Sequence, residues 1–333
     1  MNFYSKLKTS RFRRSFGVAA LVLFFGQASI AQALERDVHR SLEAAAMGGA
    51  YTAIVEDEMA IFLNPAGVAA YETMEVHWLS FDASISDDII ASGQQLSKLN
   101  NVSGSTINTF MGKNLYLDSN LRFILMSPNF GFASFYNVQL GAFAKNRALP
   151  DIELAQQQTA GFQTAFAIST SSMKKRGQGK RNKDVKSEWR FGAAPKYVFR
   201  RGGIRQLPVS TLITLDAAAI DSLFGVVGSG YGADLGVQRV HQFGPEQTLY
   251  FGASYLDVGD IRFSSTADPM KSRLNAGIGA RWKGSRSIAS ITSSIEMKQL
   301  NNSGDFQNKL HMGVKLGLPL VDLFVGLGQM NFS

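Results

Sequence analysis

The residues of this 333-residue chain that are best suited to bind an anion are cations at alternate positions of its apolar segments. Guanidinium and ammonium groups bind carboxylates and phosphates through charge-assisted hydrogen bonds. Six such cations fall on the faces predicted to point inward: Arg190, Lys196, Arg200, Arg273, Arg281 and Lys315. Two partners remain open for them, namely the head group of a bound molecule or acidic residues near the start of the chain.

Those acidic residues lie between positions 34 and 60, where only Arg36 and Arg40 oppose them. They are Glu35, Asp37, Glu43, Glu56, Asp57 and Glu58. An acidic N-terminal segment held against a basic inner face is a purely structural use of the six cations. Replacing Arg190 and Arg273 with glutamine separates the two interpretations, because only a binding role predicts altered uptake.

Metal and catalytic chemistry have little support in the sequence. The four histidines, His39, His77, His241 and His311, are scattered and none pairs at metal-ligand spacing. Cysteine is absent, which removes disulfides and thiolate metal sites. No hydrolase, metalloprotease or phosphate-loop motif occurs. We therefore expect no metal, no cofactor and no enzyme, although an enzyme with catalytic residues dispersed along the sequence stays an alternative.

The first 33 residues have the pattern of a cleavable signal peptide. Five basic residues precede an apolar run over 16–26, and Ala31-Gln32-Ala33 supplies a cleavage site. We predict cleavage after Ala33, with cleavage after Ala31 or a retained anchor as alternatives. The run is shorter than the roughly 20 residues that span a bilayer. A lipoprotein is excluded because no cysteine follows.

The charge of the chain is balanced once this leader is set aside. It holds five of the 34 basic residues and none of the 26 acidic ones, so it accounts for most of the net charge of +8. Nucleic-acid binding loses its main support. No stretch after residue 33 has 18 uncharged apolar residues, so we expect no transmembrane helix.

Alternation with a period of two dominates the rest of the chain. Bulky apolar residues occupy one face and small or polar residues the other, as in residues 130–142 and 188–200. The eleven strands predicted are 72–82, 119–127, 130–142, 159–172, 188–200, 229–240, 247–257, 272–282, 288–299, 308–318 and 321–330. This favours an all-β, antiparallel transmembrane β-barrel over a periplasmic β-sandwich. Because such barrels have even strand numbers, we expect about 12–14 strands, with one missed inside 201–228 or the barrel incomplete.

Short and long connectors mostly alternate along the predicted barrel, and the exception is residues 173–187. This connector carries seven lysines and arginines against Asp184 alone. We interpret it as a solvated turn on the periplasmic side. Contact with an anionic surface or an acidic partner is the alternative, and a strand count that is off by one would reverse the side.

Residues 34–71 do not alternate, and they carry the one specific motif. The order Met47-Gly48-Gly49-Ala50-Tyr51, then acidic residues, then Phe62-Leu63-Asn64-Pro65-Ala66-Gly67 resembles the N-terminal hatch of the FadL-like and PorV-like outer-membrane barrels. The resemblance is most specific over 41–70. It implies that residues 34–71 pack inside a barrel formed by 72–333 and plug it, with Gly48, Gly49 and Asn64–Gly67 as motif residues. The end of the chain departs from the family, whose members usually carry further strands.

The resemblance implies an outer-membrane channel for hydrophobic or amphipathic small molecules of fatty-acid type. Its partners would be outer-membrane lipid and a hydrophobic ligand. A PorV-like interaction barrel, with a secretion-system or periplasmic partner, is the alternative from another functional class. A lipid-acting barrel enzyme is the third.

Overall fold

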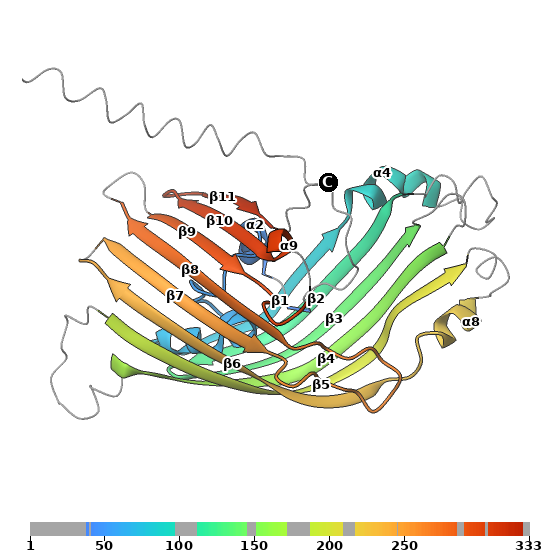
Figure 1. Cartoon of the computed structure of the whole chain (residues 1–333), viewed down its shortest axis with the longest axis horizontal. Coiled ribbons are helices and arrows are strands. Elements are labelled where there is room, and N and C mark those ends of the chain that lie inside the picture. The colour runs from blue at the N-terminus through green and yellow to red at the C-terminus, as the bar shows by residue number, and fades with distance from the viewer. Residues whose placement is uncertain are drawn as a thin grey trace, which may run out of the picture.

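The computed structural model describes residues 38–39, 41–96, 112–144, 151–171, 187–208, 217–244, 246–284, 290–303 and 306–328. The predicted signal peptide and the basic connector 173–186 therefore lie outside the described residues. Within them the chain forms one antiparallel sheet of eleven strands in sequence order. Figure 1 shows this sheet curving around residues 41–70, drawn in blue, with β1 to β3 behind and β8 to β11 in front.

The strands are β1 (Glu75–Ile85), β2 (Asn114–Ser127), β3 (Phe130–Ala144), β4 (Asp151–Ser169), β5 (Ser187–Pro208), β6 (Gly228–Gln242), β7 (Gln247–Leu256), β8 (Arg273–Lys283), β9 (Ser290–Met297), β10 (Leu310–Gly317) and β11 (Asp322–Leu327). The helices are α2 (Leu42–Ala46), α3 (Ala60–Leu63), α4 (Asp87–Leu96), α8 (Ala217–Ser222) and α9 (Phe306–Lys309), with the 3-10 helix η1 (Pro65–Ala70). All eleven predicted strands are present, and their ends differ by several residues in places.

The predicted count of 12–14 strands is wrong for the described residues. The extra strand suspected inside 201–228 is absent from the described part of that range, where β5 runs on to Pro208 and residues 217–222 form α8. β1 pairs only with β2, and β11 only with β10, so the described sheet is open between these two edges. Because every neighbouring pair is antiparallel, β1 and β11 run in the same direction.

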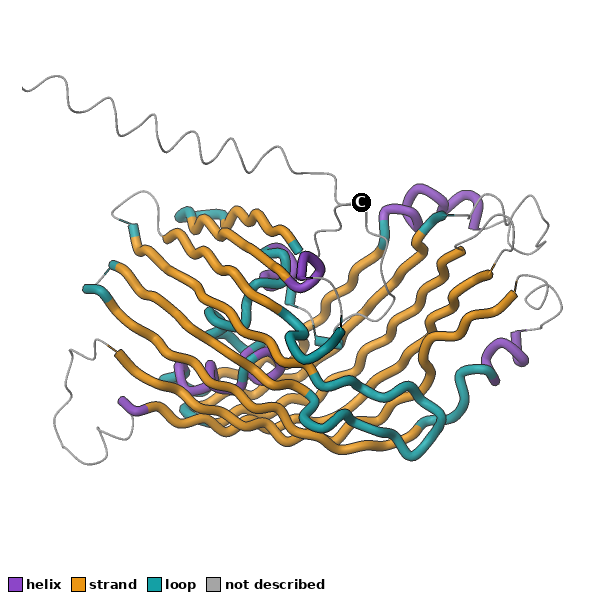
Figure 2. The backbone as a smooth tube through the Cα atoms, viewed as in Figure 1, coloured by secondary structure: helices purple, strands orange, loops and turns teal. Residues whose placement is uncertain are grey.

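The two ends of the sheet differ in their connectors (Figure 2). At the turn end, strands are joined by residues 128–129, 243–246 and 318–321, with 170–186 as the long exception. At the loop end, the connectors include 86–113, 209–227, 257–272 and 298–309. Short and long connectors therefore mostly alternate as expected, but the β3–β4 connector, residues 145–150 at the loop end, is shorter than the predicted connector between strands 130–142 and 159–172. Asn129 makes the tightest turn with a positive φ of 66°, which asparagine tolerates better than most residues.

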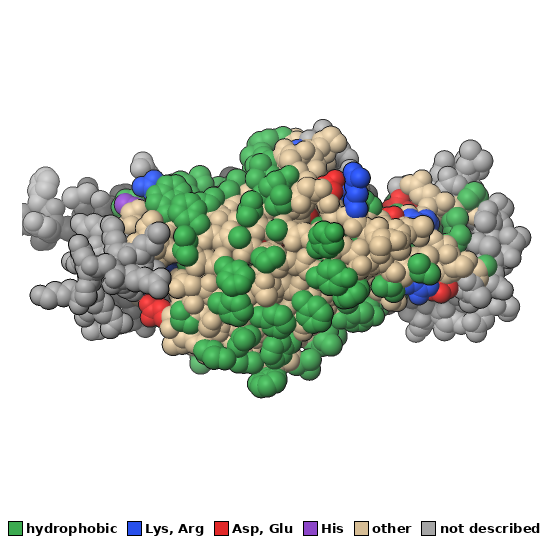
Figure 3. Space-filling model, turned by 90° about the horizontal axis from the view of Figure 1, so that it is seen from below, with side chains coloured by type: hydrophobic (Ala, Val, Ile, Leu, Met, Phe, Trp, Pro, Cys, Tyr) green, Lys and Arg blue, Asp and Glu red, His purple; other side chains and the backbone are tan. Residues whose placement is uncertain are grey.

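The two faces of the sheet differ in polarity as the alternation predicted. In β3, Tyr136 and Leu140 point outward and are exposed, whereas Asn137 and Gln139 are buried on the inner face. Figure 3 shows hydrophobic side chains gathered over the middle of the outer face, with charged ones toward its ends. No helix in the described ranges is long and apolar enough to cross a membrane.

The N-terminal residues supply much of the core. We call residues 38–71 the inner segment, because they pack on the inner face of the sheet. Met47, Ile54, Ile61 and Phe62 are almost fully buried there. They share one cluster with inward side chains of the strands, such as Ile124. Burying these side chains supplies hydrophobic stabilisation, since each contributes about 1.5–3 kcal/mol.

Candidate functional site

The inner segment begins with a capped turn of helix. Ser41 Oγ accepts a hydrogen bond of 2.8 Å from Ala44 N, which satisfies a backbone donor at the start of α2. Gly48 and Gly49 then adopt φ values of +64° and +89°, which a side chain would strain. This turn presents Gly48 O to His311 Nδ1 of β10, at 2.6 Å.

The Asn64-Pro65-Ala66-Gly67 motif forms the second turn. Asn64 Oδ1 accepts a hydrogen bond from Ala66 N at 3.2 Å and so caps η1, where Pro65 takes the first position. Asn64 Nδ2 donates to Thr52 O at 3.0 Å and to Val237 O of β6 at 3.3 Å. This single amide therefore closes the turn, ties it to the earlier part of the segment, and fastens both to the sheet.

Glycines on the inner face allow this close approach. Gly192 of β5 and Gly236 of β6 lie opposite each other in the ladder. A Cβ atom on Gly192 would lie 2.2 Å from the carbonyl carbon of Pro65, and one on Gly236 would lie 2.1 Å from Asn64 Oδ1. Gly313 and Gly326 are also opposite each other, and they receive Met47 and Gly48 in the same way. Paired glycines thus form bare patches on which the segment's backbone rests.

A buried glutamate of β9 binds the middle of the segment. Glu296 is 1% exposed. Its carboxylate accepts hydrogen bonds from Tyr51 N at 2.7 Å, Thr52 N at 2.8 Å and Thr52 Oγ1 at 2.5 Å. Three donors converging on one carboxylate satisfy a charge that burial would otherwise make costly.

Glu56 of the segment binds two of the candidate cations. Its carboxylate lies 2.7 Å from Arg190 Nη1 of β5 and 2.8 Å from Arg281 Nη1 of β8, and Tyr250 Oη donates to it at 3.2 Å. Burial acts to raise the pKa of Glu56, but the two guanidinium groups outweigh burial and hold that pKa below its ordinary value. Glu56 therefore bridges strands that are not adjacent in the sheet.

The other four candidate cations also have partners. Lys315 contacts Glu43 of the inner segment at 2.9 Å and Asp322 at 3.1 Å. Lys196 lies 2.6 Å from both Asp234 and Asp257. Arg273 binds Asp257 at 3.0 Å, and Arg200 donates to Thr159 and to a backbone carbonyl. The inner segment thus binds three of the six cations, and the strands and their connectors bind the rest.

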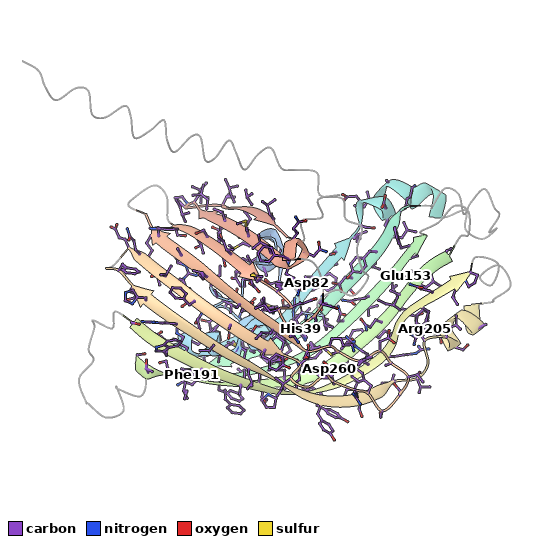
Figure 4. The ribbon with its side chains drawn as sticks, in the orientation of Figure 1. His39, Asp82, Glu153, Phe191, Arg205 and Asp260 are labelled. Carbon is purple, nitrogen blue, oxygen red and sulfur yellow. The ribbon has the colours of Figure 1, made fainter. Side chains whose placement is uncertain are left out.

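Two further groups of the segment have shifted pKa values. Burial raises the pKa of Asp57 to about 6, against the hydrogen bond of 2.6 Å that Tyr51 Oη donates to its carboxylate. His39 stacks on Phe62 with ring centroids 4.1 Å apart and meets Phe135 edge-on at 4.4 Å. Burial, then the charge of Lys196, lowers the pKa of His39 well below its usual value. Figure 4 places His39 inside the curved sheet.

Sequence reasoning missed several inner-face residues that hold the segment. Glu296 was not singled out, nor were the buried amides of Gln163 and Gln238. Gln163 Nε2 donates to Ile61 O at 2.9 Å, and Gln238 Nε2 donates to Ala53 O at 2.8 Å. The alternation places all three residues on inward faces, which is the signal that could have found them. No group of acidic residues, histidines or cysteines in the described ranges could hold a metal ion.

No protein-family model matches this chain, and no curated protein matches it. Among solved structures, the chain is similar to the Pseudomonas putida toluene transporter TodX, with a TM-score of 0.39 and 8% identity over 85% of this chain and 90% of that one. The CymD monoaromatic hydrocarbon channel gives a TM-score of 0.31 and 12% identity, over 85% and 91%. A Pseudomonas aeruginosa FadL homologue gives 0.29 and 12%, over 84% and 86%.

Proposed function

We propose that this chain is an outer-membrane channel for hydrophobic or amphipathic small molecules, with the inner segment as the hatch that closes it at rest. One observation carries the proposal: the sheet is apolar outside and charged inside. Trp78, Phe166, Ile278 and Val325, from four different strands, are all about half exposed or more on the outer face. A soluble sheet would bury that face, whereas hydrocarbon solvates it.

The connectors support one orientation in that membrane. Outer-membrane barrels have short periplasmic turns and longer external loops. The turn end would therefore face the periplasm, and the loop end would face outward. The inner segment leads into β1 at the turn end, which agrees with a hatch reached from the periplasm. A signal peptide over residues 1–33 would deliver the chain there.

The composition of the inner face supports an amphipathic substrate. Ile124, Met126 and Phe135 place apolar side chains on the inner face of β2 and β3, and Asn137 and Gln139 place polar ones on the same face. Charged groups of β5 and β8, including Arg190 and Arg281, lie across the interior. A molecule with an apolar body and a polar end would find both kinds of partner there.

Deletion of residues 34–66 tests the proposal. We expect the deletion variant, reconstituted in liposomes, to release an entrapped water-soluble dye at least tenfold faster than the intact chain. Circular dichroism of the β signal serves as the folding control. A folded deletion variant that releases dye no faster than the intact chain would count against the hatch.

The same assay addresses the head-group role of the cations. Because Arg190 contacts Glu56, Glu188 and Gln238, its partners in the structure are protein groups, which supports a structural role. Arg190→Gln should therefore weaken hatch binding, whereas Arg273→Gln should weaken the contact with Asp257 outside the hatch. If both variants keep a stable sheet and take up a charged amphiphile as fast as the intact chain, these cations do not bind the head group of the substrate.

A further inference from the structure

The connector between β7 and β8, residues 257–272, does not lie as a surface loop. It folds back over the inner face of β5 and β6 at the loop end of the sheet. Figure 2 shows it as a teal stretch crossing the orange strands. Ile261, Ala267 and Met270 are 1%, 8% and 5% exposed, which is core-like burial in a connector. Ile261 and Met270 also form a β-bridge, so the connector is a small hairpin of its own.

Backbone hydrogen bonds fasten this connector to β6. Ser264 N donates to Ser229 O at 3.0 Å, and Ser229 N donates to Ser264 Oγ at 3.0 Å. Closer to β7, Val258 N donates to Ala233 O at 2.9 Å. These bonds act like those of an extra strand laid across the inside of the sheet.

A carboxylate anchors the tip of the connector to β5. Asp268 accepts hydrogen bonds from Ile204 N at 2.8 Å and from Arg205 Nη1 at 3.0 Å. Asp268 N also donates to Gly202 O at 3.1 Å. A Cβ atom on Gly203 would lie 2.1 Å from Asp268 Oδ2, so this glycine leaves the space that the carboxylate fills.

More glycines on β6 make room for the rest of the connector. Cβ atoms on Gly230 and Gly232 would each lie less than 3 Å from Ile261, and one on Gly228 would lie 2.2 Å from Ser265. The inner segment rests on glycines further along the same strands, Gly192 and Gly236. Two separate glycine patches on β5 and β6 therefore receive two separate elements, one toward each end of the sheet.

We propose that residues 257–272 are a second closing element of the interior, in series with the inner segment and held shut by the Asp268 anchor. The inference rests on the proposed channel function and adds a constriction at the loop end. A solute that passes one element still meets the other. Release of the inner segment alone then gives a conductance that the connector limits.

Cysteine labelling tests the anchor without any transport measurement. The chain has no cysteine, so Ala267→Cys gives one buried thiol. We expect Asp268→Asn to speed its reaction with a maleimide at least fivefold. Asp260→Asn is the matched control, because Asp260 Oδ1 accepts a hydrogen bond from Ser272 N inside the connector. Figure 4 labels Asp260 within the connector and Arg205 on β5. Equal labelling in the Asp268 and Asp260 variants would overturn the anchor.

A disulfide lock tests the constriction. Ser229→Cys with Ser264→Cys joins the connector to β6 in the full chain, which also carries Glu296→Ala to free the inner segment. We expect dye release from liposomes to fall at least fivefold on oxidation and to recover with dithiothreitol, while Ser229→Cys alone shows no redox effect. Equal release in both redox states would overturn the proposal that the connector is a constriction, without contradicting the proposed channel. If deletion of residues 34–66 gives no release, the channel itself fails.

Discussion

The inner segment and the 257–272 connector both lie against the inner face of the sheet, but they are held differently. The segment is bound largely through charged side chains that come from strands across the sheet, such as Arg190 of β5 and Glu296 of β9. The connector is bound by backbone groups of β5 and β6 and by two carboxylates, Asp268 at its tip and Asp257 at its start, which contacts Lys196.

This difference predicts different modes of release. A segment fastened to many strands leaves only when several buried charges lose their partners, which is costly. The connector is fastened to two neighbouring strands, and beyond Asp257 the carboxylate of Asp268 is its only charged anchor among the contacts described above, so it can move away from the sheet while Asp257 stays bound. The first arrangement suits a stable part of the core, and the second suits an element that opens more easily.

The largest effect expected is from Glu296→Ala. Three buried donors on Tyr51 and Thr52 would lose their acceptor, at about 1–3 kcal/mol each. The inner segment should then become accessible to protease while the connector keeps Ala267→Cys protected. Mass spectrometry of the cleavage sites measures this, and Glu296→Gln, which keeps one acceptor, should lie in between. Protection of the segment in the alanine variant would show that side-chain anchors do not hold it.

A side chain at Gly192 should have the next largest effect. Gly192→Val places atoms against the backbone of Pro65, at a cost of about 3 kcal/mol. The matched control is Ala193→Val, which points outward on the same strand. We expect a lower thermal midpoint only for the Gly192 variant. Equal midpoints would mean that the segment does not rest on this glycine.

Ionisation of Asp57 should lower the stability of the inner segment, whereas the charged anchors described above raise it. The folded-state pKa of Asp57, raised to about 6, means that the native protein binds the proton more tightly than the unfolded chain does. Stability is therefore lost as the pH rises from about 4 through 6. Asp57→Asn should stabilise the segment by about 2 kcal/mol at pH 8 and have little effect at pH 4. Denaturant titrations at both pH values measure this, and a pH-independent effect would contradict the assignment.

The smallest effect expected is at the rim of the segment. Glu43 and Lys315 form a partly exposed pair, so Glu43→Gln should cost about 0.5 kcal/mol or less. The cost should shrink further in 1 M salt, since screening weakens exposed pairs. A loss above about 2 kcal/mol would place this pair among the main anchors of the segment.

Local patterns accounted for the strands and their faces. The period of two in residues such as Tyr136 and Asn137 reports directly which side of the sheet a residue takes, so both strand positions and inward cations could be predicted. The pairing of each acidic residue with its cation could not be predicted, because it depends on how a non-repeating segment lies across strands that are far away in the sequence. Alternation predicted that Lys196 points inward, but nothing local indicates that it pairs with Asp234 and Asp257.

Two features escaped the sequence for physical reasons. For the described residues the strand number was overestimated because an even count was assumed, whereas β5 continues through Pro208 into a range assigned to a loop. The sequence indicated only a connector between the predicted strands 247–257 and 272–282, and not that this connector folds inward. Its contacts need glycines on β5 and β6, and in a strand these look the same as small residues on any inward face.

The position of Glu296 has a consequence for the order of assembly. Tyr51 and Glu296 are 245 residues apart, and His311 and Lys315, which also bind the inner segment, come still later in the chain. The part of the chain that is synthesised early therefore gains its native contacts only after β9 and β10 have formed. Contacts of such long sequence separation form slowly. Until then, Ile54, Ile61 and Phe62 have no native partners and risk aggregation, so a chaperone should bind nascent chains there.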